Sequence, residues 1–370
     1  MSGVHREGTP FFERPAQLKV GVVASSPSKR VTPHLLRLRS LPPLSLYIHI
    51  PWCVRKCPYC DFNSHEARGT LPWREYVDAL IADLDQTLPR VWGRRLGTVF
   101  FGGGTPSMLP AEGVDTLLAA VRARMPLAPD AEVTLEANPG TVDVARFREL
   151  RGAGINRLSL GIQSFNPLHL AALGRIHDDH DARRAIEIGR ECFDNFNLDL
   201  MYGLPRQRVK EAVADMETAL SYAPPHLSAY HLTLEPNTLF HKHPPPLPDD
   251  DVSAEMQDRI EQGLAAQGYQ HYETSAFARP GMRCRHNVNY WMFGDYIGIG
   301  AGAHSKISFP DRVTREARYR QPGDYAGRAL AGNAVQSLSE VPQADLGFEF
   351  MMNALRLTDG FESRLFAERT

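Results

Sequence analysis

From Leu46 onward, short apolar runs alternate with amphipathic segments, and this alternation constrains the fold more than any other feature. The runs have the length and composition of buried strands, and they lie at 46–50, 98–102, 133–138, 157–163, 196–203 and 226–234. The segments between them have helical periodicity, and they lie at 75–88, 110–125, 142–152, 166–173, 180–192 and 208–222. Such alternation predicts parallel strands joined by right-handed crossovers. Six units predict an α/β protein with a partial (β/α)6 barrel.

The remainder of the chain divides into segments of different composition. We expect the barrel to cover residues 44–242, followed by a proline-rich linker at 243–251. Residues 252–341 predict a smaller α+β accessory region, which begins with an amphipathic helix at 252–268. Residues 342–370 predict the start of a helical C-terminal domain that looks cut short.

Residues 1–43 differ from the rest and predict a disordered or poorly ordered extension. The first 40 residues carry seven Lys and Arg residues against two acids, Glu7 and Glu13. An organelle transit peptide has the same arginine-rich, acid-poor character and is the alternative interpretation.

Composition excludes several classes of partner. The formal net charge is −2, so the global balance does not favour nucleic-acid binding. No stretch approaches 18 uncharged apolar residues, so we expect no stable membrane insertion. Three of the five cysteines are clustered, which is typical of a reducing compartment, and we expect a cytoplasmic protein.

The clustered cysteines are Cys53, Cys57 and Cys60, with the spacing C-x3-C-x2-C. Three thiolates can hold three irons of a [4Fe–4S] cluster, which leaves the fourth iron open to a small molecule. Zinc is an alternative, with His65 or His49 completing a Cys3His site. Unrelated core cysteines are a further alternative, and a disulfide framework does not fit the odd cysteine count.

Small and polar residues gather at the ends of the predicted strands, where a barrel of this class carries its site. A glycine run, Gly102–Gly104, follows the second strand, and Glu136 and Asp199 lie within the third and fifth. The glycines would let a ligand lie against the backbone. An acid inside an apolar strand is rarely unpaired, so each carboxylate either binds a ligand or pairs with a buried arginine such as Arg175.

Six motifs in combination resemble radical S-adenosylmethionine (SAM) proteins, and more narrowly the oxygen-independent coproporphyrinogen III oxidases and their relatives. They are Tyr47-Ile-His-Ile-Pro, the cysteine run with Tyr59, GGGTPS, LEANPG, LGIQSF and LDLMYGLP, and the resemblance runs from residue 44 to about residue 360. It implies that the three cysteines ligate a [4Fe–4S] cluster whose open iron binds SAM. It also implies an electron donor for the cluster. The residues expected at the SAM pocket are Tyr47, Gly103, Gly104, Thr105, Glu136, Gln163, Arg175 and Asp199.

Two branches of this family differ at recognisable positions. The oxidases carry a fourth cysteine two residues after the third, where this chain has Phe62. The other branch, heme chaperones of the HemW type, carries H-N-x-x-Y-W, which is similar to the run from His286 to Trp291 here. The resemblance therefore favours a heme chaperone that passes heme to an unidentified acceptor protein. The alternative is an enzyme that oxidatively decarboxylates coproporphyrinogen III, and a third is a zinc-stabilised binding module.

The run around His286 suggests how heme would be held. Neutral imidazole is a common heme ligand, so His286 is the expected axial ligand, and Tyr290 and Trp291 offer flat apolar surface. Cys284 is a second soft ligand or an attachment site, and Arg283 and Arg285 could pair with heme propionates. The alternative for His286 is a core histidine. Whether SAM is cleaved, whether heme is attached covalently, and the oligomeric state stay open at this point.

Overall fold

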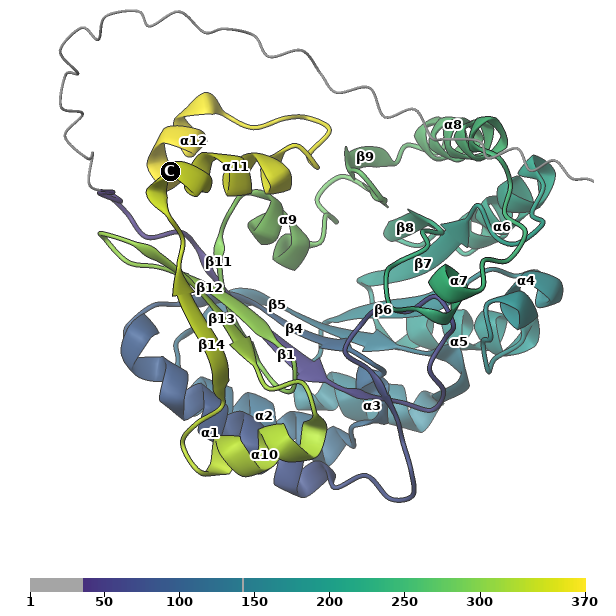
Figure 1. The fold of residues 1–370 in the computed structure, drawn as a ribbon. Helices are drawn as coiled ribbons and strands as arrows, with labels where there is room; N and C mark the ends of the chain where they lie inside the picture. The colour runs from purple at the N-terminus through teal and green to yellow at the C-terminus, as the bar shows by residue number, and fades with distance from the viewer. Residues whose placement is uncertain (1–35, 142) are drawn as a thin grey trace, which may run out of the picture. The chain divides into compact units, whose positions relative to one another are not determined.

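A single mixed sheet organises the chain. The computed structural model describes residues 36–141 and 143–370, and within them one sheet has twelve strands in the order β14-β13-β12-β11-β1-β4-β5-β6-β7-β8-β10-β9. Six neighbouring strands at its centre are parallel and follow chain order (Figure 1). They are β1 (Leu44–Ile50), β4 (Leu96–Gly103), β5 (Leu127–Ala137), β6 (Arg157–Gln163), β7 (Phe196–Tyr202) and β8 (His226–His231). These are the six strands that the sequence predicts.

The crossover helices also lie where helical periodicity predicts them, within three residues at each end. They are α1 (Trp73–Val91), α2 (Ala111–Arg124), α3 (Val144–Ala153), α4 (Pro167–Ala172), α5 (Asp179–Cys192) and α6 (Val209–Ser221). Side-chain caps set several ends: Asp143 accepts from the Arg146 N–H, and Asp178 forms a capping box with Asp181. Val142, the first residue of one predicted helix, lies outside the described residues.

The two faces of the parallel sheet differ in chemistry. One face, which we call the outer face, carries Leu46, Val99 and Leu158 and their equivalents, all fully buried. Helices α1, α2 and α3 lie on this side in Figure 1. On the other face, which we call the inner face, alternate positions of the same strands carry polar side chains such as Glu136, Arg157 and Asp199. The composition of the strands suggested that both faces are apolar. In the structure only the outer face is apolar.

The region after the barrel extends the same sheet at both edges. On one side, β10 (Ala276–Ala278) pairs antiparallel with β8, and β9 (Gln270–Glu273) follows it. On the other side, β11 (Asp295–Ile299) pairs parallel with β1. Three antiparallel strands continue from there: β12 (His304–Ser308), β13 (Val313–Arg318) and β14 (Val335–Glu340). The strands before and after residues 243–251 belong to one sheet, so the sheet does not mark a domain boundary there. The boundaries expected at 243–251 and 341 stay predictions.

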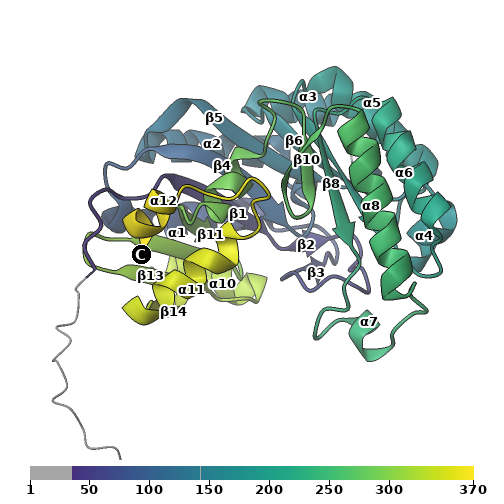
Figure 2. The same ribbon diagram turned by 90° about the horizontal axis from the view of Figure 1, so that it is seen from above.

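Helices of this region cover both faces. The helix α8 (Asp250–Ala266) lies beside α6, as Figure 2 shows, and α10 (Pro322–Leu330) lies beside α1. The short helix α9 (Arg285–Trp291) lies on the inner face, against β1, β4 and β11. A four-residue helix, α7 (Leu239–Lys242), precedes α8.

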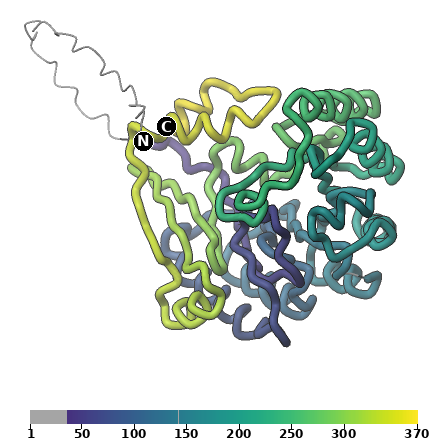
Figure 3. The backbone as a smooth tube through the Cα atoms, turned by 45° about the vertical axis from the view of Figure 1, so that its right-hand side comes forward, coloured from purple at the N-terminus to yellow at the C-terminus, as the bar shows by residue number. Residues whose placement is uncertain are grey.

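The first described residues pack against the end of the chain. Leu36 is buried in an apolar cluster with Phe293 and Phe350, and the Leu38 N–H donates to the Pro310 carbonyl at 2.9 Å. Phe350 belongs to α11 (Gln343–Ala354), which α12 (Ser363–Arg369) follows; Figure 3 shows the purple start of the described chain beside this yellow end. Ordered contacts thus begin before residue 43, where the extension was expected to end; residues 1–35 lie outside the described part. No helix in the described part is long and apolar enough to cross a membrane.

Candidate functional site

The three clustered cysteines lie on one loop directly after β1. Cys53 ends the short strand β2 (Trp52–Cys53), which pairs with β3 (His65–Glu66), and Cys57 and Cys60 lie between these strands. Backbone bonds hold the loop, because the Cys60 N–H donates to the Cys57 carbonyl and the Ala67 N–H to the Cys53 carbonyl. All three are free thiols and partly exposed. The loop therefore presents three sulfur ligands at the carboxyl end of the first parallel strand.

The glycine run packs directly against this loop. The N–H groups of Gly104 and Thr105 donate to the Ile50 and Trp52 carbonyls at 2.8 and 2.7 Å. A Cβ on Gly104 would lie 2.6 Å from the Trp52 carbonyl oxygen and 3.0 Å from the Cys53 Sγ. Gly103 has a φ of +117°, and a Cβ there would meet the His49 ring at 2.6 Å. Only glycine fits these positions, so the glycine run and the cysteine loop form one unit.

Arg175 connects the cysteine loop to the fourth parallel strand. Its guanidinium donates to the Gly161 carbonyl at 2.8 Å and to the Cys57 Sγ at 3.7 Å. Near it, Gln163 ends β6 with a φ of +67°, a left-handed conformation that is costly for a residue with a side chain. Arg175 makes no bond to Glu136 or Asp199, so the pairing considered from sequence is not formed.

The three thiolates are a donor set that an iron–sulfur cluster accepts, and His49 is not free to complete a mononuclear zinc site. Zinc holds thiolates at about 2.3 Å, so all its sulfur ligands lie within roughly 4.6 Å of one another. Among the described residues, no group of three or more His, Cys, Asp or Glu side chains is arranged to hold a single metal ion. His49 is also engaged at both ring nitrogens, by the Tyr47 hydroxyl at 2.9 Å and the Asn63 carbonyl at 2.8 Å. A cubane spreads three thiolates over three irons and tolerates a wider triangle.

Two carboxylates on the inner face form the electrostatic centre of the site. Burial, together with the nearby Asp199, raises the pKa of Glu136 to about 8, although the Gly103 N–H donates to its Oε2 at 3.2 Å. Burial also raises the pKa of Asp199, against hydrogen bonds from Ser159 and Asn197. A cation placed between these groups would ionise both, since it would supply the charge that burial removes from water. The pair therefore fits a ligand with an ammonium or sulfonium group.

Three inner-face residues around this pair were not predicted from the sequence. Arg157 is almost fully buried, and its charge lowers the pKa of both Glu136 and Asp199, so it is the buried arginine of this site rather than Arg175. Ser159 and Asn197 are the side chains that bind Asp199. The available signal was the two-residue spacing of polar side chains along β6 and β7, which places them all on one face.

His286 is buried on the inner face and does not line the cysteine loop. It is 2% exposed, its ring lies 4.9 Å from that of Phe100 and 5.0 Å from that of Tyr290, and its Nδ1 lies 2.8 Å from the Thr98 Oγ1. The Nε2 is buried and has no hydrogen-bond partner among the residues that the structure describes. Burial lowers the pKa of His286 to about 3, so the imidazole is neutral. The core-histidine alternative describes this position well, and heme could reach His286 only if α9 moved.

The other residues expected to help hold heme are already engaged. Cys284 is 1% exposed, its Sγ lies 3.7 Å from the Glu132 Oε1, and burial raises its pKa to about 12, which disfavours a thiolate ligand or attachment. Arg283 and Arg285 pair with Asp359 and Asp130 at 2.7 and 3.1 Å instead of standing free for propionates. Trp291 is covered by the Arg356 guanidinium, 4.3 Å from the ring centroid.

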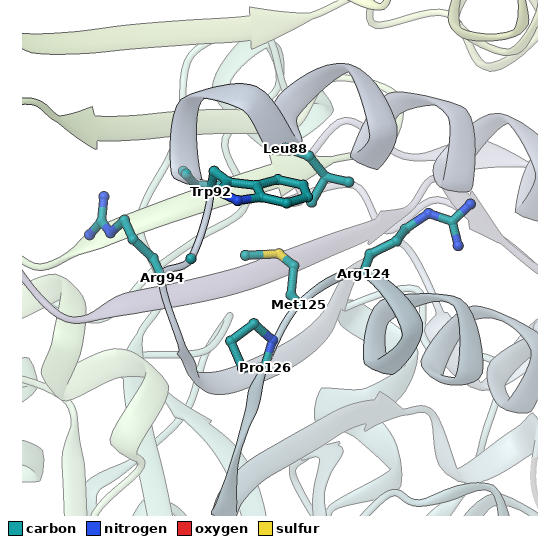
Figure 4. A pocket seen from close by; sticks show the side chains of 8 residues that line it. Leu88, Trp92, Arg94, Arg124, Met125 and Pro126 are labelled. Carbon is teal, nitrogen blue, oxygen red and sulfur yellow. The ribbon is translucent and has the colours of Figure 1, made fainter.

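Two surface pockets differ in their relation to this site. A polar pocket of about 360 Å³ lies beside the cysteine loop, and its lining residues are Lys56, Cys60, Asp61, Pro236, Asn237 and Arg320. Figure 4 shows the other pocket, of about 190 Å³, between the end of α1 and the segment that joins α2 to β5. Trp92, Arg94 and Met125 line it. This second pocket lies at the amino-terminal ends of β4 and β5, so it is not part of the site.

Comparison with known proteins places the chain among relatives. Residues 47–219 match the radical SAM superfamily. The chain is 53% identical to the heme chaperone HemW of Escherichia coli (strain K12) over 321 residues, which cover 86% of this chain and 84% of that protein. It is 36% identical to the heme chaperone HemW of Bacillus subtilis (strain 168) over 332 residues, which cover 88% and 86%.

Among solved structures, the chain resembles the coproporphyrinogen III oxidase HemN from Escherichia coli, which is described as a radical SAM enzyme. The TM-score is 0.74 at 26% sequence identity, and the match covers 85% of this chain and 76% of that one. This confirms the expected fold class. The segment that matches the superfamily includes the cysteine loop, the glycine run and both inner-face carboxylates.

Proposed function

Because this chain belongs to the HemW heme chaperone family of the radical SAM superfamily, we propose that it binds heme and transfers it to an acceptor protein. The observation that carries this proposal is the 53% identity to a heme chaperone over 86% of the chain. The run from His286 to Trp291 and the Phe62 position, both noted from sequence, agree with it. Five free cysteines also agree with a reducing compartment.

Cys53, Cys57 and Cys60 would hold a [4Fe–4S] cluster, and the neighbouring residues would bind SAM. When bound, such a cluster supplies one-electron chemistry and an iron corner open to a chelating ligand. The protein's own contribution is placement: Gly103 and Gly104 allow close approach, and Glu136 and Asp199 offer negative charge to a cation. The expected pocket also includes Tyr47, Thr105, Gln163 and Arg175. This assignment rests on the family and on the fit of the donor set.

An electron donor for the cluster would approach at the polar pocket beside Cys60. Lys56 and Arg320 give this pocket two cationic side chains, against one acid, Asp61. Cys60 itself lines the pocket, so a partner seated there would come close to a cluster ligand. The charge balance favours a donor with an acidic surface.

His286 would be the heme ligand, with α9 moving to expose it. The Thr98 hydroxyl donates to Ser45 Oγ at 2.8 Å, so the Thr98 oxygen is left to accept from the His286 Nδ1–H. This tautomer places the lone pair of the neutral ring on Nε2, the buried atom without a partner. Neutral imidazole with a free lone pair is what heme iron requires.

A heme titration on anaerobically reconstituted protein tests the proposal. We expect about one heme per chain by absorbance, transfer of that heme to an apo-acceptor, and no conversion of coproporphyrinogen III. Conversion at a rate comparable with that of an oxygen-independent coproporphyrinogen III oxidase would replace the chaperone assignment with the oxidase one. Failure to bind heme with the cluster intact would contradict both the heme site and the chaperone role.

A further inference from the structure

A row of polar side chains crosses the inner face between three neighbouring strands. Ser159, Asn197 and His226 are register partners on β6, β7 and β8, so their side chains stand side by side. The Asn197 Nδ2 donates to the Ser159 Oγ and to the Asp199 Oδ1, each at 2.8 Å. The Asn197 Oδ1 lies 2.6 Å from the His226 Nδ1. The row therefore begins at a carboxylate of the SAM pocket proposed above.

The hydrogen bonds continue in one direction from the row to α9. The Asn197 Oδ1 can only accept, so His226 carries its proton on Nδ1 and accepts at Nε2. Burial lowers the pKa of His226 well below its usual value, which keeps the ring neutral. Its Nε2 lies 2.8 Å from the Tyr272 hydroxyl, which donates to it. The Tyr272 oxygen in turn accepts from the Cys284 N–H at 3.2 Å.

Cys284 is the residue that caps α9, so the chain of bonds ends at the start of the helix that carries His286. A second clamp acts on the same turn. The Glu132 carboxylate accepts from the N–H groups of Arg285 and His286, each at 3.2 Å. The start of α9 is thus held from β9 through Tyr272 and from β5 through Glu132. All links from Asp199 to Cys284 are buried or partly buried.

The Asp199 carboxylate is the acceptor at the end of the whole chain of hydrogen bonds. Every donor points toward the carboxylate: Cys284 to Tyr272, Tyr272 to His226, His226 to Asn197, and Asn197 to Asp199. Bonds aligned in this way polarise one another, and an ionised acceptor at the end strengthens them. A cationic ligand that pairs with Asp199 would fix this carboxylate in place, and the bonds that end on it would then be ordered as well.

We propose that Asn197, His226 and Tyr272 are positioning residues that couple a cationic ligand at Asp199 to the start of helix α9. The inference rests on the proposed function for the identity of that ligand, SAM. With the ligand present, Asp199 is held in place, the chain of hydrogen bonds is ordered, and α9 stays in the position that buries His286. Without it, the clamp on Cys284 weakens and α9 opens more readily. SAM and heme binding at His286 therefore oppose each other, and each weakens the other by the same factor.

Hydrogen exchange on the full chain tests the coupling without heme. The protein is reconstituted anaerobically with its cluster, and amide exchange in residues 285–291 is followed with and without saturating SAM. We expect SAM to slow exchange there by about fivefold, the low end of ordinary couplings between sites. In Tyr272→Phe the ring stays packed, but the hydroxyl that links His226 to Cys284 is gone. We expect this variant to bind SAM and to lose the SAM-dependent slowing.

A matched control separates positioning from general loosening. Tyr269→Phe also removes a buried hydroxyl, which donates to the Pro224 carbonyl outside the chain of bonds. It should keep the wild-type response to SAM. A purely structural role for Tyr272 would speed exchange equally in both states and leave their ratio unchanged. SAM binding by calorimetry with unchanged α9 exchange in wild type would overturn the coupling and leave the proposed function standing. No SAM binding to cluster-loaded protein would overturn both.

Discussion

The two faces of the parallel sheet carry different kinds of side chain. On the outer face, residues such as Leu158 and Leu160 are fully buried beneath helices. On the inner face, their neighbours Arg157 and Ser159 belong to a network of charged and polar groups that reaches α9. Adjacent residues of one strand therefore have different roles. The outer face stabilises the fold by packing against helices, and the inner face carries the residues of the candidate site.

This difference explains why the inner face tolerates unfavourable electrostatics. Two carboxylates with raised pKa values and a buried, incompletely paired arginine add nothing to stability. Their cost is offset by the apolar packing on the outer face. Changes on the outer face should thus alter stability, whereas changes on the inner face should alter binding.

The largest expected effect is on the cysteine loop, where a substitution should remove the cluster and leave both faces of the sheet folded. In Cys53→Ala we expect complete loss of the iron–sulfur absorbance, because two thiolates do not hold the cluster, and a helical circular dichroism signal close to that of wild type. Cys192→Ala is the control, since Cys192 lies at the end of α5, away from the loop. A cluster that persists without Cys53 would remove this residue from the ligand set.

Neighbouring substitutions on β6 sharpen the comparison directly. Leu158→Ala should lower the free energy of unfolding by about 2–5 kcal/mol, because it leaves a cavity under the helices. Ser159→Ala should cost only about 1–2 kcal/mol, since it removes the hydrogen bonds to Asp199 and Asn197, yet it should weaken SAM binding more than Leu158→Ala does. Urea denaturation and calorimetry measure the two quantities. Equal effects on SAM affinity would break the distinction between the faces.

Glu136→Gln tests the inner face by charge alone. We expect SAM affinity to fall about tenfold or more, a loss of at least ~1.4 kcal/mol, because one negative charge is gone. The pKa of Glu136 is about 8 in the folded protein and near 4.3 when unfolded. The folded state therefore holds a proton that the unfolded state releases between these values, and wild-type stability falls as pH rises from about 4.3 to about 8. The variant should lose this part of the pH dependence.

Proton release on binding gives the smallest signal. Since a bound cation lowers the pKa of Glu136, SAM binding at pH 7 should release up to about one proton per chain. Affinity should rise with pH until it levels off above pH 8. Calorimetry in buffers with different ionisation enthalpies measures the release. Proton uptake would contradict the charge assigned to the pair.

The sequence predicted the outer face well and the inner face in part. Continuous apolar runs and helical periodicity gave all six strands and their crossovers, because burial of Leu and Val follows directly from composition. The motifs gave the glycine run and the cysteine loop, which the structure brings together at Gly104. Arg157 and Asn197 were missed, because a polar side chain inside an apolar run carries no sign of its partners.

The surroundings of His286 could not be predicted for a different reason. Its burial depends on contacts with Thr98 of β4 and Glu132 of β5, which lie 188 and 154 residues earlier in the chain. Cys284 and the two flanking arginines were considered for heme from proximity in sequence, and in the structure they contact Glu132, Asp359 and Asp130. Such long-range pairings have no local signature.

Metal analysis of protein purified without oxygen tests the central claim most directly: the cysteine loop seats a cubane with one open iron at the inner face. We predict about four irons and four sulfides per chain, with a spectrum that changes when SAM is added. Zinc in place of iron, or iron without sulfide, would contradict the account.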